Sequence, residues 1–573
     1  MVKNLHTQNT DLIIPGLVPL CTEALEAVGA YAASVRRTVG ALVDNGDSKS
    51  GSAADEHQFA LHALAWIETY HAALASMLAW IGTLRETGRD GELEQLIVQA
   101  AFGEYLAQLA GGIAMSQSEI ARPIDVGIGR KRVIKLKAGA AGRLIDAGNT
   151  DRVRGRIAQL LAHEPSGGDA GIADEALSMM RDQARKFVET EVLPFGQEWH
   201  NRDMLIPIEV INKLAALGVF GITIPEEHGG LGLGKLAMCI VTEELSRGNL
   251  GVGSLVTRSE IAAEMIGANG TPRQLSEWLS RIASGETLPA AVFTEPGAGS
   301  DLGSLQTRAS AIDGGYSLTG SKTWITHAAR ADLMVILART GTAAGNRGLS
   351  IFLAAKERGN EANPFPAKGL SGGEIPVLGY RGMKEYELAF DDFPLRPDAL
   401  LGGTENCGFR QLMATFESAR IQTAARAVGV AQNALEIALS YAAERNQFGK
   451  PLIYFPRIAG KLAWMAMETM IVRQLTYHAA RRKDAGHRCD IEAGMAKLLA
   501  ARVAFANADS ALQIHGGNGY AQEYAISRVF CDARILSIFE GAAEIQAGII
   551  ARGILSRQNQ RIPVQPIGYS EPL

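Results

Sequence analysis

The stretch AAVFTEPGAGSD, residues 290–301, marks the point where the sequence changes from helical to β-type patterning. A short apolar run ends there in a glycine-rich turn, which lets backbone N–H groups approach a ligand closely. Further β-type runs follow it: YSLTG, KTWIT, ADLMVILART, GLSIFLAA and YELAFDDF. Turn-type segments separate them: GAGSD, DGG, GTAAGNRG and SGGE. The pattern predicts a small all-β domain over residues 288–400.

Helical patterns flank this domain on both sides. Apolar residues recur every three or four positions from residue 58, from residue 93 and again after residue 408. HEPSGGDAG, residues 163–171, is the best candidate for a linker, and PEEHGGLGLG interrupts the next helical block. We therefore expect a mainly α chain with a central β domain. Its predicted parts are a helical extension (1–170), a helical domain (171–287), the β domain (288–400) and a helical bundle (401–573).

Composition excludes several classes of protein. Across 573 residues, 47% are hydrophobic and 20% charged, and 56 Lys and Arg against 61 Asp and Glu leave a net charge of −5. This balance disfavours a nucleic-acid binder driven by overall charge. The five cysteines are scattered without a CxxC pair, which predicts reduced thiols in a cytosolic protein and no zinc site. No apolar run is long enough to span a membrane, and the proline-interrupted LIIPGLVPLC near the start is interpreted as part of the mature protein.

Three further motifs suggest ligand chemistry. In SKTWITHA, strand alternation places Trp324 and Thr326 on one side, where they suit a flat, hydrogen-bonding ring; a buried core tryptophan is the alternative. QIHGGNGY, residues 513–520, is a close-approach turn suited to a pyrophosphate, with His515 as a packed neighbour. In ILSIFEGAAEIQAGIIAR, Glu540 stands between an apolar run and a glycine, either as a base or as a helix cap or solvated residue.

Taken together, TEPGAGSD, KTWIT, ERNQFGKP, QIHGGNGY and FEG…EIQ resemble, in order and spacing, the acyl-CoA dehydrogenase family over residues 172–554. The resemblance implies a helical domain, a central β-barrel or sandwich domain and a C-terminal four-helix bundle, here with an N-terminal helical extension. It also implies a cytoplasmic FAD enzyme with an acyl-CoA substrate and an electron-transfer flavoprotein as acceptor. The expected assembly is a homodimer or a dimer of dimers.

The resemblance assigns residues to the flavin. Phe293 and Thr294 would lie against the isoalloxazine, Thr326 would donate to flavin N5, and Trp324 would cover the ring edge where the electron acceptor docks. Ser300 would fall between flavin and CoA. The remaining implied flavin positions are Ile325, Arg445, Phe448, Gln513, Gly516, Gly517, Ala542 and Glu544. Of these, Arg445, Phe448 and the turn from Gln513 to Gly517 would hold the FAD adenylate across a subunit boundary. Two departures concern this site: Ala542 replaces the usual threonine, and Phe455-Pro456 replaces a polar pair.

Glu540 aligns with the family's general base, which removes the pro-R α-proton of a thioester while a β-hydride leaves for flavin N5. Behind an apolar wall, the pKa of this carboxyl should rise toward working pH. Gly541 would let the chain approach the thioester, whose oxygen needs donors as charge develops. Arg420 would lie near the substrate and Arg552 at its CoA end.

The acyl pocket floor predicts the substrate class. GVGSLVTRSEIAAEM, residues 251–265, clusters Ser254, Thr257 and Arg258 where long-chain enzymes need apolar residues, so we expect an anionic acyl group. The alternative is that Arg258 faces solvent or pairs with Glu260 or Glu264. With the long extension, this floor resembles the branch of the family that oxidises (2S)-methylsuccinyl-CoA to mesaconyl-CoA in the ethylmalonyl-CoA pathway.

Other assignments remain open. A short branched-chain or glutaryl-type dehydrogenase is the main alternative, although Val252 occupies the position of the glutaryl-type arginine. An acyl-CoA oxidase shares most of these motifs. A DNA-associated alkylation-response flavoprotein is a third alternative, for which GRKRVIKLK, residues 129–137, is the one candidate basic surface.

Overall fold

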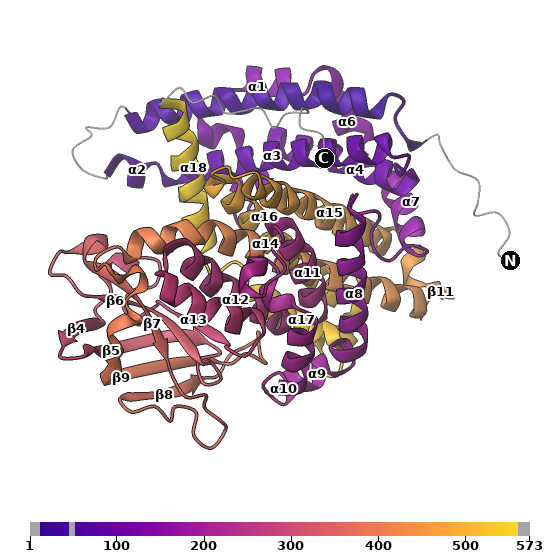
Figure 1. Ribbon diagram of the computed structural model, residues 1–573. Coiled ribbons are helices and arrows are strands. Elements are labelled where there is room, and N and C mark those ends of the chain that lie inside the picture. Colours follow the sequence, from indigo (N-terminus) through magenta and orange to yellow (C-terminus); the bar gives the residue numbers. More distant parts are fainter. Residues whose placement is uncertain (1–11, 45–51, 560–573) are drawn as a thin grey trace. The chain divides into compact units, whose positions relative to one another are not determined.

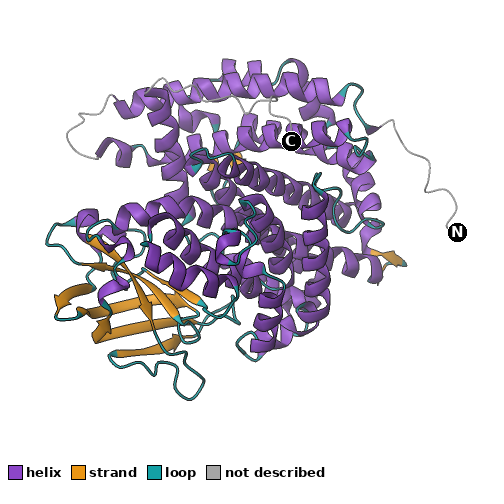
Figure 2. Cartoon of the chain, viewed as in Figure 1, coloured by secondary structure: helices purple, strands orange, loops and turns teal. Residues whose placement is uncertain are grey.

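The computed structural model describes residues 12–44 and 52–559, and the chain divides into two compact units (Figure 1). The first unit joins the described residues between 12 and 178 with 430–482 and 488–559. The second unit comprises residues 179–429 with 483–487. Figure 2 shows that the strands are concentrated in one part of an otherwise helical chain.

The second unit contains a seven-stranded sheet in the order β3-β6-β4-β5-β9-β8, with β7 paired to β6. Its strands are β3 (Pro289–Val292), β4 (Arg308–Ile312), β5 (Gly315–Thr326), β6 (Leu333–Arg339), β7 (Leu349–Ala355), β8 (Leu370–Ile375) and β9 (Glu385–Leu395). Pairing is antiparallel except where β6 meets β3 and β4. β6 and β7 are buried along nearly their whole length, which explains why their sequences are continuous apolar runs.

The strands differ from the sequence-based expectation in three places. YSLTG and KTWIT belong to one 12-residue strand, β5. The prediction that SGGE is a turn is wrong, because these residues lie within β8, which pairs along its full length with β9. β4 was not expected at all, because RASAI contains one β-branched residue and no aromatic residue.

The helices of the second unit surround and extend this sheet. They are most of α8 (Glu175–Glu191), α9 (Leu193–Asn201), α10 (Ile208–Ala216), α11 (Lys235–Gly248), α12 (Leu250–Asn269), α13 (Pro272–Ala283) and the first part of α14 (Gly408–Glu444). α12 and α13 contribute Ile266, Trp278 and Ile282 to a core that also receives Val335 and Ile351 from the sheet. This core supports the part of the sheet where the candidate flavin segments end.

The first unit is helical apart from two short hairpins. Its extension comprises α1 (Leu17–Asp44), α2 (Ser52–Glu56), α3 (Gln58–Glu86), α4 (Glu92–Gly111), α5 (Arg130–Leu136), α6 (Gly139–Ala147) and α7 (Asp151–Leu161). The later helices are the end of α14, α15 (Pro456–Asp484), α16 (Asp490–His515), α17 (Ala525–Ile535) and α18 (Ala543–Asn559). α3 packs against both α16 and α18, which places the extension on the C-terminal helices (Figure 1). None of the described helices is both long and apolar enough to cross a membrane.

A buried polar cluster joins the extension to the C-terminal helices. The rings of Tyr70 on α3 and Tyr105 on α4 stack with centroids 3.9 Å apart. Arg502 Nη1 on α16 donates to the Tyr70 hydroxyl at 2.8 Å, and the Tyr105 hydroxyl donates to Glu468 Oε1 on α15 at 3.2 Å. Arg502 and Glu468 also form an ion pair. Burial raises the pKa of Tyr70 to about 12, so its hydroxyl stays protonated as a donor.

The predicted linker is packed against the first unit. Trp80 Nε1 donates to the carbonyl oxygen of Asp169 at 2.9 Å, and Arg89 pairs with the Asp169 carboxylate at 3.0 Å. Gln474 Nε2 on α15 donates to the Ala170 carbonyl at 2.9 Å. The Pro- and Gly-rich composition therefore marks a docked connection between α7 and α8, and the boundary between units falls later, inside α8.

Candidate active site

Two segments implied for the flavin lie side by side in the second unit. Phe293 and Thr294 follow β3, and Trp324, Ile325 and Thr326 end β5. The backbone N–H of Thr323 donates to the Thr294 carbonyl at 3.0 Å, which joins the two strand ends. The pairing of strands far apart in sequence thus creates one continuous edge from both motifs.

A fully buried lysine braces this edge. Lys322 Nζ donates to the Phe293 carbonyl at 2.9 Å, to Glu295 Oε1 at 2.9 Å and to the Leu337 carbonyl at 2.8 Å. Burial lowers the pKa of Lys322 to about 8, partly offset by the neighbouring carboxylate of Glu295. Burial would raise the pKa of Glu295, but Lys322 and the backbone N–H of Gln306 outweigh it, so that pKa lies below its ordinary value. Sequence analysis missed this ion pair because its members are 27 residues apart.

Trp324 is an exposed surface residue. A β-bulge interrupts the β5–β9 pairing between Lys322 and Ile325, and Trp324 adopts a left-handed φ of 59°. Its side chain is 55% exposed, so the alternative of a buried core tryptophan is wrong. Ile325 and Thr326 are buried, and the Thr326 hydroxyl donates to Glu385 Oε1 at 2.7 Å. A hydroxyl has one proton to donate, so in this structure it is not available for the expected hydrogen bond to flavin N5. The bulge also breaks the strict alternation from which Trp324 and Thr326 were expected to share a side.

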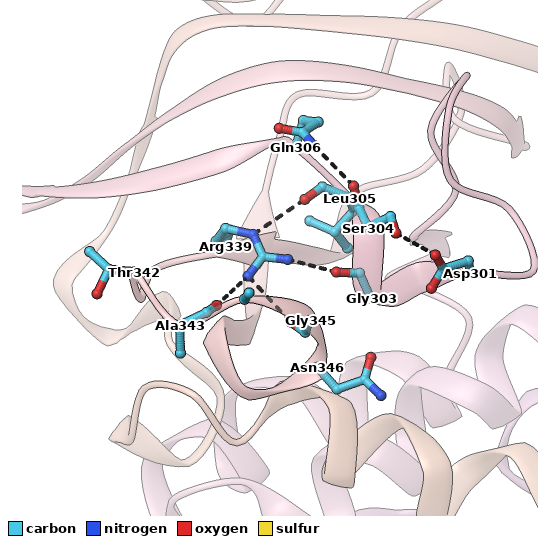
Figure 3. Close-up of a pocket in the computed structure, with 11 residues that line it drawn as sticks. Asp301, Gly303, Ser304, Leu305, Gln306, Arg339, Thr342, Ala343, Gly345 and Asn346 are labelled. Atoms are coloured by element: carbon cyan, nitrogen blue, oxygen red, sulfur yellow. Dashed lines mark hydrogen bonds between the residues drawn. The ribbon is translucent and has the colours of Figure 1, made fainter. Parts of the chain in front are cut away.

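The glycine-rich turn after β3 is open. A side chain added at Gly297 would meet no heavy atom within 4 Å, and Ser300 is exposed. A cavity of about 550 Å³ lies next to this turn, lined by residues from Asp301 to Gln306 and from Thr342 to Asn346 (Figure 3). Arg339 donates there to the carbonyl oxygens of Gly303 and Ala343, both at 2.8 Å. The guanidinium therefore fixes the loops around the cavity.

The predicted pocket floor on α12 is buried, but its hydroxyls are used within the protein. Ser254 Oγ donates to the Leu250 carbonyl at 2.9 Å and accepts a hydrogen bond from Arg426 Nη1 at 2.9 Å. Thr257 Oγ1 donates to the Gly253 carbonyl at 3.3 Å. Each hydroxyl therefore donates its proton within α12, and neither proton is available to an acyl group as expected. Sequence analysis missed Arg426, which is fully buried on α14. The signal that could have found it is a single charge in the apolar segment AARAVG.

Arg258 is buried on α12, with 9% of its surface exposed, so the alternative in which it faces solvent is wrong. Glu260 pairs with Lys235, and Glu264 accepts from Lys235 at 3.0 Å and from Ser418 at 2.9 Å. Lys235 is thus a counter-charge of both glutamates. Arg420 is also buried, and its guanidinium lies 5.8 Å from the centre of the Phe416 ring.

His327, directly after Thr326, is a second buried group that the motifs did not single out. Its side chain is 2% exposed, and within the described residues neither ring nitrogen has a hydrogen-bond partner. Burial lowers the pKa of His327 to about 3, with help from the positive charges of Arg330 and Arg358. This end of β5 therefore combines a neutral imidazole with a positive electrostatic environment that includes Arg258.

The candidate base lies on a strained turn of the first unit. Glu540 is half-buried between α17 and α18 with a φ of 52°, and Gly541 follows with a φ of 95°. The φ of Gly541 is one that residues with a side chain rarely adopt, and a side chain there would come within 1.9 Å of Gln546 Nε2. α18 begins at Ala543, so Glu540 does not cap this helix. Non-glycine residues in left-handed conformations concentrate at functional sites.

The implied adenylate residues of the first unit are exposed. Phe448, in the hairpin formed by β10 (Asn446–Gln447) and β11 (Lys450–Pro451), is 94% exposed with a φ of 50°. Arg445, Gln513, Gly516, Gly517, Glu544 and Arg552 are exposed as well, and Ala542 is half-buried. These positions are available to a ligand or to a second subunit.

The QIHGGNGY turn differs from expectation in one respect. It follows the C-terminus of α16, so the helix dipole there disfavours a pyrophosphate, and binding would depend on the backbone N–H groups of the short helix Gly516–Tyr520. His515 is a packed neighbour, as expected: its ring stacks on Tyr441 at 4.1 Å, and its Nδ1 lies 2.7 Å from the Ala511 carbonyl.

The residues present fit FAD in both units. The second unit offers an exposed indole, half-buried Phe293 and Thr294 and an open glycine turn at one sheet edge, as a flat ring requires. The first unit offers exposed polar and aromatic groups around Phe448 and Gly516, where added side chains at Gly516 and Gly517 would meet nothing within 4 Å. Each set is assembled by its own unit.

Three domain profiles of the acyl-CoA dehydrogenase family match the chain, at residues 174–286 (N-terminal), 290–393 (middle) and 406–555 (C-terminal). The (2S)-methylsuccinyl-CoA dehydrogenase of Cereibacter sphaeroides is 57% identical over 546 residues, covering 95% of this chain and 99% of that protein. A match of that span includes the extension.

Solved structures cover less of the chain. Butyryl-CoA dehydrogenase from Megasphaera elsdenii superposes with a TM-score of 0.63 at 32% identity, covering 67% of this chain and 99% of its own. A structure described as PigA with FAD and proline superposes with a TM-score of 0.62 at 27% identity, covering 67% of this chain and 98% of its own. With its three domains in the same order, the chain belongs to the acyl-CoA dehydrogenase family of FAD-dependent oxidoreductases.

Proposed function

We propose that this protein oxidises (2S)-methylsuccinyl-CoA to mesaconyl-CoA, as a step of the ethylmalonyl-CoA pathway. The observation that carries this proposal is the 57% identity to a (2S)-methylsuccinyl-CoA dehydrogenase over 95% of the chain, extension included. The fold neighbours, by comparison, cover about two thirds of the chain. The scattered cysteines support a cytoplasmic location, and the exposed hairpin around Phe448 supports at least a homodimer.

In this proposal Glu540 is the general base. Its carboxylate takes the α-proton of the thioester, and Gly541, with its positive φ, carries the chain through the turn beside it. The left-handed turn holds the carboxylate at a fixed angle, which favours a reactive alignment. Backbone N–H groups of the same turn would stabilise negative charge on the thioester oxygen as the proton leaves.

FAD, when bound, accepts the β-hydride of the substrate. Phe293, Thr294, Trp324 and Thr326 would hold its ring at the sheet edge that Lys322 braces. The exposed indole of Trp324 lies where an electron-transfer flavoprotein would approach. Arg445, Phe448 and the turn at Gln513–Gly517 would bind the adenylate.

Arg258 would recognise the second carboxylate of the substrate. A buried guanidinium binds a carboxylate through charge-assisted hydrogen bonds, which a neutral acyl group cannot form. Arg420 would lie nearby and Arg552 at the CoA end. The positive environment around His327 adds to the preference for an anionic acyl group.

The test is a panel of CoA thioesters assayed with an artificial electron acceptor and with oxygen. We expect methylsuccinyl-CoA to have a higher kcat/KM than butyryl-, isovaleryl- and glutaryl-CoA, with no carbon dioxide released. A faster reaction with a neutral thioester would contradict the substrate, and release of carbon dioxide from glutaryl-CoA would favour the glutaryl-type alternative. Rapid reoxidation by oxygen after anaerobic reduction would identify an oxidase.

The base assignment has its own variant. Glu540→Gln keeps the size of the side chain but removes its basicity, so we expect kcat to fall by about 10²–10⁴-fold. Flavin absorbance and substrate-analogue binding should persist, because the residue is not assigned to cofactor retention. Glu523→Gln, an exposed carboxylate just before α17 that is assigned to no binding site, is the matched control and should retain substrate-analogue binding and turnover. A Glu540→Gln enzyme with wild-type kcat would exclude Glu540 as the base.

A further inference from the structure

A buried lysine contacts the turn that carries Glu540. Lys497 lies on α16 with 1% of its surface exposed, and its Nζ donates to the carbonyl oxygen of Gly541. Transferring an ammonium group from water to a protein interior costs several kcal/mol unless it is partnered. The lysine sits seven residues into a helix whose neighbours Ala496, Leu498 and Leu499 are all buried and apolar. The charge of Lys497 is therefore best explained by the backbone group that it binds.

The turn is fixed from three directions. The Ala543 N–H donates to the Ser537 carbonyl at 3.1 Å, which closes the loop between α17 and α18. Gln546, 1% exposed on α18, lies against the Cα of Gly541. Third, Lys497 Nζ, on α16, donates a hydrogen bond to the Gly541 carbonyl.

This third contact acts on the strained part of the backbone. Glu540 and Gly541 are successive residues with positive φ, a conformation that is unfavourable for a non-glycine residue. Such a turn persists only when its surroundings determine it strongly. A charge-assisted hydrogen bond is stronger than a neutral one and loses little to solvent when buried, so Lys497 can fix the orientation of the Gly541–Ala542 peptide.

The geometry points to Lys497 as a positioning residue that holds Glu540 in its reactive orientation by anchoring the Gly541 carbonyl. This inference rests on the proposed role of Glu540 as the base. It assigns no substrate contact to the lysine. Its consequence is that removing the ammonium should harm the chemical step more than substrate binding, because a shift of about 1 Å in a reacting group can cost about 100-fold in rate.

The test compares Lys497→Met with Lys497→Arg, using the CoA thioester that the wild-type enzyme oxidises fastest. In the flavin-loaded methionine variant we expect kcat to fall about 10–100-fold, with KM and the Kd of a non-reacting thioester changed less than about threefold. The arginine variant retains a buried donor and charge, so it should recover a large part of kcat. Arg557→Gln is the matched control, because it removes an ion pair between α16 and α18 at 3.3 Å without touching the turn, and it should retain kcat.

Each outcome decides the inference. A Lys497→Met enzyme with wild-type kcat, or one in which KM, flavin retention and kcat fail together, overturns it. If the methionine variant does not fold, the arginine variant provides the test. A folded arginine variant with most of the wild-type kcat supports the positioning role. A fall in its kcat of about 100-fold, or failure of both variants to fold, overturns the inference. Glu540→Gln measured in parallel separates the two proposals, since unchanged kcat there rejects the base assignment whatever Lys497 does.

Discussion

At the scale of single residues, the second unit concentrates buried charge beside the candidate flavin edge. Arg258, Arg420 and Arg426 are all less than a tenth exposed on two helices, α12 and α14. Buried guanidinium groups are costly to desolvate and are retained where they recognise something or fix a structure. Arg426 binds Ser254 and Thr423, which is a structural use. Arg258 is the one of the three that we assign to the acyl group.

Arg258→Gln should separate dicarboxylic from neutral substrates. Loss of a buried carboxylate contact costs about 2–5 kcal/mol, so kcat/KM for methylsuccinyl-CoA should fall by about 30-fold or more. For butyryl-CoA we expect a loss smaller than about fivefold, because no charge pair is broken. Arg273→Gln, which is 75% exposed, is the control. Equal losses for both substrates would remove Arg258 from the acyl pocket.

His327 predicts a measurable dependence of stability on pH. Burial lowers its folded pKa to about 3 from an ordinary value of 6.5, so between these values the unfolded chain binds more protons than the folded one. The contribution of neutral His327 to the free energy of unfolding is fully present above pH 6.5 and is lost as the pH falls toward 3. The thermal midpoint of His327→Gln should therefore decline less between pH 7 and 4 than that of the wild type, whereas the exposed His163→Gln should follow the wild type. Parallel curves for His327→Gln and the wild type would contradict this.

At the scale of elements, β5 shows how one strand can serve two purposes. Its first half pairs regularly with β4, whereas its pairing with β9 already shifts register between Leu318 and Gly320. Its end is bulged between Lys322 and Ile325, so that Trp324 is exposed while Lys322 stays buried. The bulge reorients successive side chains in a way that regular pleating does not permit. Lys322 then joins the ends of β3 and β5 to the middle of β6 through the Leu337 carbonyl.

Lys322→Met should weaken flavin retention. The substitution removes three hydrogen bonds and leaves the Glu295 carboxylate buried without its lysine, which costs about 3–5 kcal/mol. We expect a lower thermal midpoint and a Kd for FAD raised by about 10-fold or more, measured by flavin fluorescence on dilution. The double variant Lys322→Met/Glu295→Gln should regain part of the thermal midpoint. Lys384→Met, which breaks the partly exposed pair with Glu374, is the control and should bind FAD normally.

The long helices were predictable from their apolar periodicity, and the buried strands β6 and β7 from their continuous apolar runs. The SGGE segment was mispredicted because glycines favour turns locally, whereas pairing with β9 determines its structure. The segment 163–171 has a linker composition but is held by Trp80 and Arg89. Motifs singled out the candidate flavin segments and Glu540, which stay predictions. Lys497 and Arg426 were missed because each is one charge within an apolar helix, and only tertiary packing shows what it binds.

At the scale of the whole chain, the extension is built into the first unit. α3 is buried over most of its length against helices from the other end of the sequence, and the cluster around Tyr70 adds polar contacts that only this pairing satisfies. Buried polar networks favour one arrangement over others, because any slip leaves groups unpaired. We infer that the extension and the C-terminal helices depend on each other for folding.

Glu468→Gln tests that dependence. Glu468 is 2% exposed, and its loss leaves the Arg502 guanidinium without its ion pair, at a cost of about 3 kcal/mol or more. The thermal midpoint should fall by about 5 °C or more. Glu492→Gln breaks ion pairs with Arg482 and Arg557 and should cost less than about 1 kcal/mol. A midpoint for Glu468→Gln as high as that of Glu492→Gln would show that the cluster adds little.

The contact between α3 and α18 also bears on biosynthesis. The ribosome completes residue 86 long before residue 543, and at about 5–20 residues per second the interval is roughly half a minute to a minute and a half. During that time the apolar surface of α3 lacks its eventual neighbour, while residues 179–429 have all emerged. Nascent chains should accordingly bind chaperones through the extension, and ribosome stalling late in the message should yield aggregates.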